Sequence, residues 1–158
     1  MNGLGFGRVA AIEISHGGDS MISNGSAPGA YVLHLALEAS LRVRIRTLGE
    51  HVLSPGRYFY VGSARRGMAA RCRRHERLSR MKQGKAHWHI DALLTARRCR
   101  LIRIETFPGA DECAVSRQLA RRENIVAPIP GFGATDCRSG CPAHLYLASN
   151  LKPAASRR

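Results

Sequence analysis

The stretch GRYFYVGSARRGMAARCRRH, residues 56–75, decides the fold and carries the clearest functional signal in the chain. Its aromatic and apolar beginning, 57–61, predicts a short strand, the following Gly-Ser-Ala segment predicts a turn, and the arginine-rich remainder predicts a helix. Arg71 and His75 are one helical turn apart and share a face near the helix N-terminus, where the helix dipole favours an anion. We therefore expect an anion-binding site at this strand–turn–helix junction.

The composition indicates that this anion is a phosphate of nucleic acid. The 158 residues include 25 Lys and Arg against 11 Asp and Glu, a formal net charge of +14. Apart from Lys82, Lys85 and Lys152 the basic residues are arginines, which bind phosphates in a bidentate manner and stack on bases. A GC-rich genome that encodes Arg in place of Lys would also explain this bias. We favour nucleic acid because the charge is clustered: residues 65–82 hold eight basic residues and one acid.

The rest of the composition limits the class of protein. An apolar content of 44% is typical of a globular chain, and the length suits one domain. No apolar run approaches the length of a membrane span, and the N-terminus lacks the pattern of a secretion signal. Five cysteines with irregular spacing favour a reducing, cytoplasmic location over a disulfide framework. We expect a flexible leader at 1–28, a single domain at 29–150 and a basic tail at 151–158; the oligomeric state is left open.

Hydrophobic periodicity predicts an α+β fold with a small mixed or antiparallel sheet of about three core strands flanked by helices. Segments 31–37 and 41–48 alternate and predict an antiparallel hairpin, with 57–61 as the third strand. Further patterns predict helices at 67–82, at 88–97 and from Asp111 as N-cap to about 124, and strands at 101–107 and 144–148. In the second strand the arginines alternate with apolar residues, which predicts one buried face and one basic face formed by Arg42, Arg44 and Arg46.

Several residues are ordinary individually, but together they occur in a recognisable order along the chain. Alone, Tyr31 and Tyr60 are typical half-buried sheet aromatics, and Glu112 is typical of the first turn of a helix. With GAY at 29–31, YVG at 60–62, then Arg71, His75 and Glu112, the chain resembles the GIY-YIG nuclease superfamily. More narrowly, YVGSA at 60–64, HWHID at 87–91 and GFGATDC…AHLYL at 131–147 resemble a small stand-alone branch catalogued as a domain of unknown function.

The resemblance implies a divalent-metal-dependent endonuclease that hydrolyses phosphodiester bonds, with DNA as the expected partner. Glu112 would bind Mg²⁺ or Mn²⁺, and Arg71 would hold the phosphate and stabilise the charge that develops in the transition state. Tyr31 would take the proton of the attacking water or position it. A phenol is a poor base at neutral pH, so nearby arginine and metal would have to lower its pKa. Tyr60 would orient phosphate or water, and His75 would shuttle protons.

The remaining candidates belong to the expected nucleic-acid surface. They are Gly62, Ser63, Arg65 and Arg66 in the turn, Arg74 on the helix, and the stripe of Arg42, Arg44 and Arg46. Outside this surface, the resemblance gives Asn124 a counterpart in several members of the superfamily, and His87 and His89 would either line the rim of the active cleft or bond to neighbouring carbonyl groups. Where some superfamily members have Lys, this chain has Ser63, so Arg65 or Arg66 would supply the positive charge there. Phosphate contacts of this kind do not specify a base sequence. A catalytically silent nucleic-acid-binding module on the same scaffold is the alternative function.

The spacing of Cys137, Cys141 and His144 is also compatible with Zn²⁺. No fourth ligand is evident beside them, so His87 or His89 would have to complete the site. The other interpretation, which we favour from the sequence, is a Gly-rich loop that packs two cysteines ahead of a strand. HWHID resembles part of a zinc deaminase motif, but the required glutamate and cysteine pair are missing, which excludes that chemistry.

Overall fold

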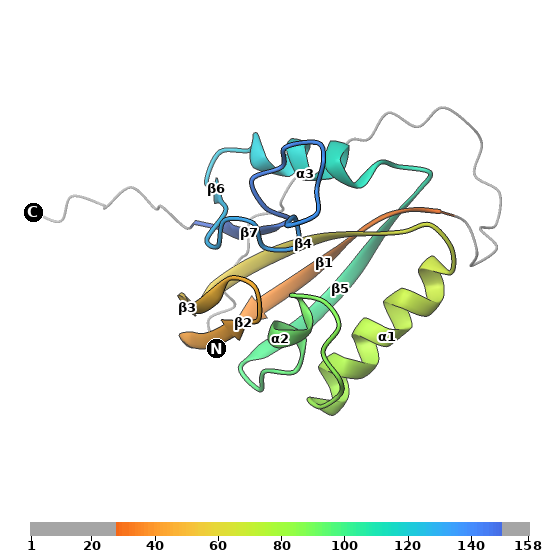
Figure 1. Ribbon diagram of the computed structural model, residues 1–158. Coiled ribbons are helices and arrows are strands. Elements are labelled where there is room, and N and C mark those ends of the chain that lie inside the picture. The colour runs from red at the N-terminus through yellow and green to blue at the C-terminus, as the bar shows by residue number, and fades with distance from the viewer. Residues whose placement is uncertain (1–27, 150–158) are drawn as a thin grey trace, which may run out of the picture.

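The computed structural model describes residues 28–149, which form an α+β fold built on a five-stranded sheet (Figure 1). The strands lie in the order β5-β1-β4-β7-β6, and neighbours run antiparallel. Their bounds are β1 (Gly29–Leu37), β4 (Gly56–Ala64), β5 (Cys99–Pro108), β6 (Ile125–Val126) and β7 (Leu145–Ala148). The predicted class is confirmed, and the strand expected at 144–148 is β7. About three core strands were too few, because the two-residue β6 is too short to show periodicity, and β4 continues through residues 62–64, where a turn was expected. Segments 1–27 and 151–158, expected as leader and tail, lie outside the described residues.

The predicted hairpin between 31–37 and 41–48 is wrong. Strand β1 pairs with β4 on one side and β5 on the other, and β2 (Leu41–Ile45) pairs with β3 (Gly49–Leu53) in a separate two-stranded sheet. The difference follows from burial, because residues 31–35 are buried on both faces of the sheet and β2 on only one. Gly49, with a φ of 81°, starts β3 directly after the turn at residues 46–48. Arg42 and Arg44 nevertheless alternate with buried residues and are exposed, as predicted.

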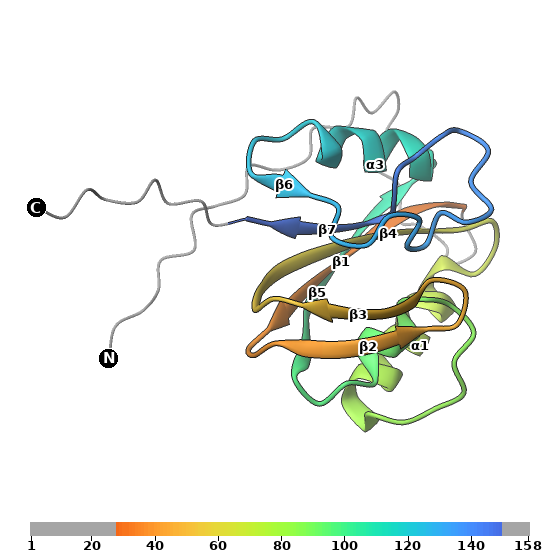
Figure 2. The same ribbon diagram turned by 60° about the vertical axis from the view of Figure 1, so that its left-hand side comes forward.

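The sheet separates two apolar cores (Figures 1 and 2). Helices α1 (Met68–Met81) and α2 (Asp91–Leu94) cover one face together with the β2–β3 hairpin, and α3 (Glu112–Ala120) covers the other. Alternate residues of β1 enter different cores: Leu33 and Leu35 pack on the α1 side, and Ala30 and Val32 on the α3 side. None of the helices in the described part is long and apolar enough to cross a membrane.

Helix bounds agree with the sequence for α1 and differ for α2 and α3. Gly67 precedes α1 and Lys82 follows it, and both adopt a left-handed backbone conformation, with φ of 63° and 57°. The helix bounds are therefore close to the predicted 67–82. Helix α2 is a single turn, not 88–97, because the Asp91 carboxylate accepts the backbone N–H groups of residues 87 and 88 and holds them outside the helix. Asp111 caps α3 as predicted, by accepting the N–H of Ala114. This helix ends at residue 120, and Asn124 then reverses the chain at φ 63°.

Candidate functional site

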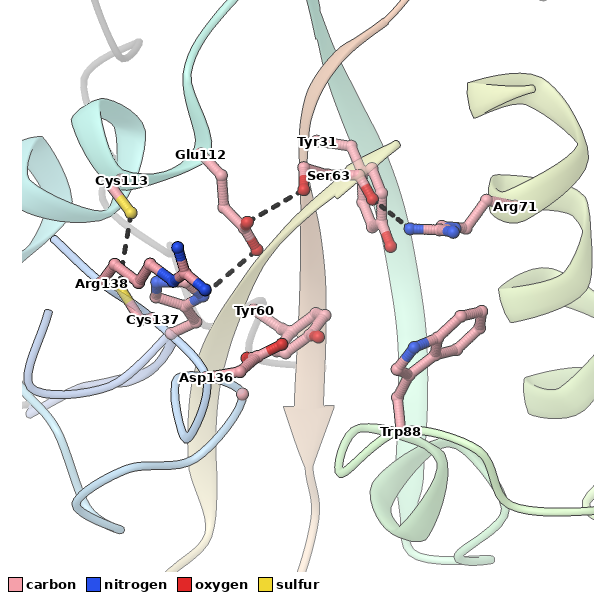
Figure 3. Close-up of a pocket in the computed structure, with 12 residues that line it drawn as sticks. Tyr31, Tyr60, Ser63, Arg71, Trp88, Glu112, Cys113, Asp136, Cys137 and Arg138 are labelled. Carbon is pink, nitrogen blue, oxygen red and sulfur yellow. Dashed lines mark hydrogen bonds and ion pairs between the residues drawn. The ribbon is translucent and has the colours of Figure 1, made fainter. Parts of the chain in front are cut away.

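A cavity of about 340 Å³ opens where the ends of β1 and β4 meet α1 and α3 (Figure 3). Tyr31 reaches it from β1, Tyr60 and Ser63 from β4, Arg71 from α1 and Glu112 from α3. Its other lining residues are Trp88, Cys113, Gly133, Asp136, Cys137, Arg138 and His144. Four of the five residues that the sequence suggested as catalytic therefore line one cavity, although four separate elements supply them.

The fifth, His75, lies directly behind Tyr31. The Tyr31 hydroxyl is 2.7 Å from His75 Nε2, and both side chains are buried. Burial lowers the pKa of His75 to about 4, so the ring is neutral near pH 7. Burial also raises the pKa of Tyr31 well above its ordinary value, with Tyr60 adding to the rise, and Arg71 opposes this only in part. The expected lowering of the Tyr31 pKa by arginine is therefore outweighed by burial.

Two glycines allow the tyrosines to enter the cavity. A Cβ atom on Gly62 would lie 2.4 Å from Cζ of Tyr31, so only glycine leaves room for that ring. A Cβ on Gly133, which has a φ of 70°, would lie 2.9 Å from Cε2 of Tyr60. Gly62 thus acts by admitting Tyr31. Burial raises the pKa of Tyr60 above its ordinary value, so Tyr60 also keeps its proton.

Glu112 occupies the first turn of α3, where the dipole favours a carboxylate. Ser63 Oγ donates to its Oε2 at 2.9 Å, and His144 Nδ1 lies 3.2 Å from its Oε1. The Ser63 hydroxyl, expected on the nucleic-acid surface, is therefore directed at Glu112. Burial is the largest single effect on His144 and acts to lower its pKa, but Glu112 and Cys137 together outweigh it and the pKa is raised.

Arg71 is held beside the cavity from two sides. Its Nη1 donates to the carbonyl of Ser63, and its guanidinium lies 4.8 Å from the ring centroid of Trp88. Arg74 contacts the same ring at 4.6 Å, and it also donates twice to the Asp91 carboxylate, at 2.9 and 3.0 Å. Asp91 is completely buried, and burial, the largest single effect, acts to raise its pKa. The bonds from Arg74 and from the backbone N–H groups of residues 87 and 88 together hold that pKa below its ordinary value. Arg74 thus has a structural partner, which distinguishes it from Arg71.

The other predicted nucleic-acid residues are distributed around the cavity. Arg65 and Arg66 are exposed in the turn between β4 and α1, and Arg46 is exposed in the β2–β3 turn. That turn reaches the cavity wall through His89, whose Nδ1 accepts the N–H of Gly133 and whose Nε2 is 2.8 Å from Thr47 Oγ1. His89 thus links the β2–β3 turn to the loop that contains Gly133, through one hydrogen bond to each. His87 is exposed beside Trp88, and Asn124 is exposed in the turn after α3, outside the cavity lining.

A second constellation lies against the same wall of the cavity. The ligand atoms of Cys113, Cys137, Cys141 and His144 all lie within 4.8 Å of one another, so the cluster could hold a metal ion. Cys113 takes the place for which the sequence had suggested His87 or His89. The signal for it was weak, because Cys113 is distant in sequence and reaches the cluster only through the packing of α3. All five cysteines of the chain are free thiols.

Sequence reasoning also missed Trp88, Asp136 and Arg138 as cavity residues. Trp88 is 39% exposed, and its ring lies against the guanidinium groups of Arg71 and Arg74. Asp136 and Arg138 lie in an irregular loop, where no periodicity indicates which way a side chain points. Figure 3 shows Asp136 and Glu112 directed into the same cavity from different segments.

Residues 30–157 match the family model described as Domain of unknown function DUF123. No curated protein and no solved structure matches this chain.

Proposed function

This chain belongs to the family Domain of unknown function DUF123. We propose, from the geometry of its cavity, that it is a metal-dependent endonuclease that hydrolyses phosphodiester bonds of nucleic acid, DNA foremost. One observation carries the proposal: Tyr31, Tyr60, Arg71 and Glu112 line one cavity, with His75 hydrogen-bonded behind Tyr31. These are the residues implied by the resemblance to the GIY-YIG nucleases. Their convergence supports that resemblance, because unrelated sheet tyrosines and surface arginines have no reason to meet.

Arg71 is suited to bind the scissile phosphate. Its contacts with the Ser63 carbonyl and the Trp88 ring fix the guanidinium plane before substrate arrives. A guanidinium has five N–H donors, so those not used by Ser63 remain for phosphate oxygens. A donor held in place in advance stabilises developing charge without a cost of reorganisation in the transition state. Tyr60, which keeps its proton, orients a phosphate oxygen or the water by donating to it.

Tyr31 and His75 form a route for the proton of the attacking water. As the water oxygen bonds to phosphorus, the bond to the leaving sugar oxygen breaks. The leaving oxygen takes the electron pair of that bond and a proton from solvent, and the proton of the attacking water passes to the Tyr31 hydroxyl. Because that phenol is neutral, it accepts a proton only by giving its own to His75 Nε2, which is 2.7 Å away. His75 is neutral near pH 7 and has a nitrogen lone pair for this transfer.

The donor set on the α3 side of the cavity fits a hard divalent cation. Glu112 and Asp136 provide carboxylate oxygens in a cavity with room for waters, which Mg²⁺ and Mn²⁺ retain when bound by proteins. Such an ion would polarise the phosphate and offset its charge. Ser63 and His144 hold the Glu112 carboxylate in one orientation toward this region. Thiolates are soft ligands, so we assign the ion to the carboxylates and not to the cysteine cluster.

The decisive experiment incubates the full chain with supercoiled, linear, single-stranded and branched DNA and with RNA, in Mg²⁺ or Mn²⁺. We expect Glu112→Gln to lower cleavage by at least about 100-fold. Arg71→Ala should lose cleavage to a similar extent while retaining most of the binding. Glu123→Gln and Arg73→Ala are matched controls, since both residues are exposed and outside the cavity lining.

Equal cleavage by wild type and Glu112→Gln would contradict the active-site assignment. Binding of nucleic acid by wild type without cleavage of any substrate would favour the alternative, a catalytically silent binding module.

A further inference from the structure

The cluster of Cys113, Cys137, Cys141 and His144 has the dimensions of a closed metal site. Cys113 belongs to the first turn of α3, the other two cysteines to the irregular loop 127–144, and His144 immediately precedes β7. The Sγ atoms of Cys113 and Cys137 are 3.5 Å apart. Two sulfurs on a tetrahedral zinc ion, each about 2.3 Å from it, are separated by about 3.8 Å. All four ligand atoms of the cluster lie within 4.8 Å of one another. This arrangement suits a shared ion better than a disulfide, which joins only two sulfurs.

His144 provides independent evidence for a ligand. Its side chain is almost completely buried, and neither ring nitrogen makes a well-aligned hydrogen bond. Buried polar atoms without partners are rare, because each costs about 1–3 kcal/mol. Nδ1 lies on the side of Glu112, 3.2 Å from Oε1. We therefore assign Nε2 to the cluster.

We propose that these four residues bind one Zn²⁺ ion that holds the wall of the cavity in place. Three thiolates and one imidazole are soft and borderline donors, which select zinc over Mg²⁺ or Ca²⁺. Four protein ligands leave no open position, so the ion is structural. On binding, the three thiols release their protons to solvent, and the ion and the ligands form four new bonds.

The position of the site explains what the ion does. Segment 127–144 has no helix or strand, and Gly131, Gly133 and Gly140 adopt positive φ in it. A zinc ion would tie this segment to the first turn of α3 at Cys113, next to Glu112. It would also fix the ring of His144, whose other nitrogen then donates to Glu112, the arrangement by which outer groups orient metal-binding histidines. His144 is thus a positioning residue for Glu112.

Metal analysis of the purified full chain tests the site without reference to cleavage. After reconstitution with Zn²⁺ and dialysis we expect one zinc per chain. Replacement by Co²⁺ should give the intense thiolate-to-cobalt and d–d absorption of a tetrahedral sulfur-rich site. Cys141→Ser should lose most of the zinc, whereas Cys72→Ser should keep it, because Cys72 lies on α1 away from the cluster. The cobalt spectrum of wild type needs no variant, so poor folding of Cys141→Ser would not obscure the result.

Hydrogen exchange tests the structural role. With zinc, amides of 131–144 and of the first turn of α3 should exchange at least about tenfold more slowly than in the chelated protein, while β1 and β4 change little. The site is overturned by a wild type without stoichiometric zinc, by equal zinc in both cysteine variants, or by a disulfide mass loss of about 2 Da among the cluster cysteines. Exchange that is unaffected by zinc overturns its structural role.

One further test rests on the proposed function and uses a variant of His144. His144→Cys retains four zinc ligands but removes the nitrogen beside Glu112, so zinc should stay bound while cleavage requires a higher Mg²⁺ concentration. An unchanged Mg²⁺ dependence contradicts the positioning of Glu112. A wild type that binds zinc and cleaves nothing contradicts the nuclease and leaves the zinc site intact.

Discussion

Tyr31 and His75 show how burial, more than neighbouring charge, sets the chemistry of single residues in this cavity. Taking an ionisable group out of water disfavours its charged form, so the same burial raises the pKa of the phenol and lowers that of the imidazole. Arg71 pulls the Tyr31 pKa down, yet it does not reverse the effect of burial. The pair is therefore a neutral hydrogen-bonded unit, and a proton crosses it only when a third group supplies one.

The low pKa of His75 makes stability depend on pH. In the unfolded chain His75 takes up a proton below its ordinary pKa of 6.5, whereas in the folded state it stays neutral down to about pH 4. Its contribution to the free energy of unfolding is thus complete above pH 6.5 and declines between pH 6.5 and 4. The total decline is on the order of 3 kcal/mol. Urea unfolding of wild type and His75→Gln across this range measures it, and parallel pH profiles of the two proteins would contradict it.

Tyr31→Phe separates the proposed catalytic role of the Tyr31 hydroxyl from the packing of the ring. We expect cleavage to fall by at least about 100-fold, because the proton route to His75 is interrupted. His75 Nε2 is left without its partner, which should lower the free energy of unfolding by about 1–3 kcal/mol. Cleavage assays and urea unfolding measure the two effects.

Tyr58→Phe is the matched control, since Tyr58 is a buried tyrosine of the same sheet whose hydroxyl donates to the Ser54 carbonyl at 2.6 Å, outside the cavity lining. It should lose about 0.5–1.5 kcal/mol of stability and retain cleavage. Comparable cleavage by both variants would remove the Tyr31 hydroxyl from the mechanism.

At the scale of elements, neighbouring turns of α1 carry two different roles, one at the cavity and one in holding the fold. Arg71 faces the cavity, and Arg74 fastens the loop before α2 through the completely buried Asp91. Trp88 lies against both guanidinium groups. The geometry of Arg71 therefore depends on a neighbouring ion pair that itself need not touch substrate.

Arg74→Ala should lower the free energy of unfolding by about 3–5 kcal/mol, because it leaves the Asp91 carboxylate buried without its cation. Arg73→Ala, an exposed change on the same helix, should stay within about 0.5 kcal/mol of wild type. Urea unfolding compares the two. If Arg74 instead served as a phosphate ligand, Arg74→Ala would leave stability near that of Arg73→Ala and reduce the salt dependence of nucleic-acid binding.

The elements that the sequence predicted well are those with strong local signals. Helix α1 lies between Gly67 and Lys82 as predicted, and Asp111 caps α3 through a local hydrogen bond. Strand pairing was predicted wrongly, because alternation shows which face is buried and contains no information about the neighbour. Helix α2 was overestimated, since the Asp91 carboxylate accepts N–H groups just before the helix begins, and Arg74 of α1, a tertiary partner, holds that carboxylate in place.

The candidate site was predictable where motif residues lie on regular elements. Tyr31, Tyr60, Arg71 and Glu112 were identified from the sequence and meet at one cavity. Cys113 and Asp136 were not assigned to it, because packing of α3 and of an irregular loop, not spacing, brings them there. The role of Arg74 could not be anticipated either, since its partner Asp91 is 17 residues away.

At the scale of the whole molecule, the excess of positive charge must be compared with the position of the cavity. The chain carries a net charge of +14, yet the cavity itself combines Arg71 and Arg138 with Glu112 and Asp136. Attraction of the proposed nucleic-acid substrate would therefore depend on arginines around the cavity. The β2–β3 hairpin is adjacent, since its Thr47 is connected through His89 to Gly133 on the cavity wall. Helix α3 covers the opposite face of the sheet (Figure 1).

Changing Arg42, Arg44 and Arg46 together to Ala should weaken nucleic-acid binding and reduce its dependence on salt. Each phosphate that is no longer neutralised lowers the slope of log K against log salt by about 0.9, so three phosphates correspond to about 2.7. The control variant changes Arg117, Arg121 and Arg122 to Ala, which removes the same charge near the end of α3. Because Arg117, Arg121 and Arg122 lie in or just after the last turn of α3 and do not line the cavity, we expect a smaller change in slope. Equal slopes in the two variants would show that net charge alone, and not the hairpin, attracts the nucleic acid.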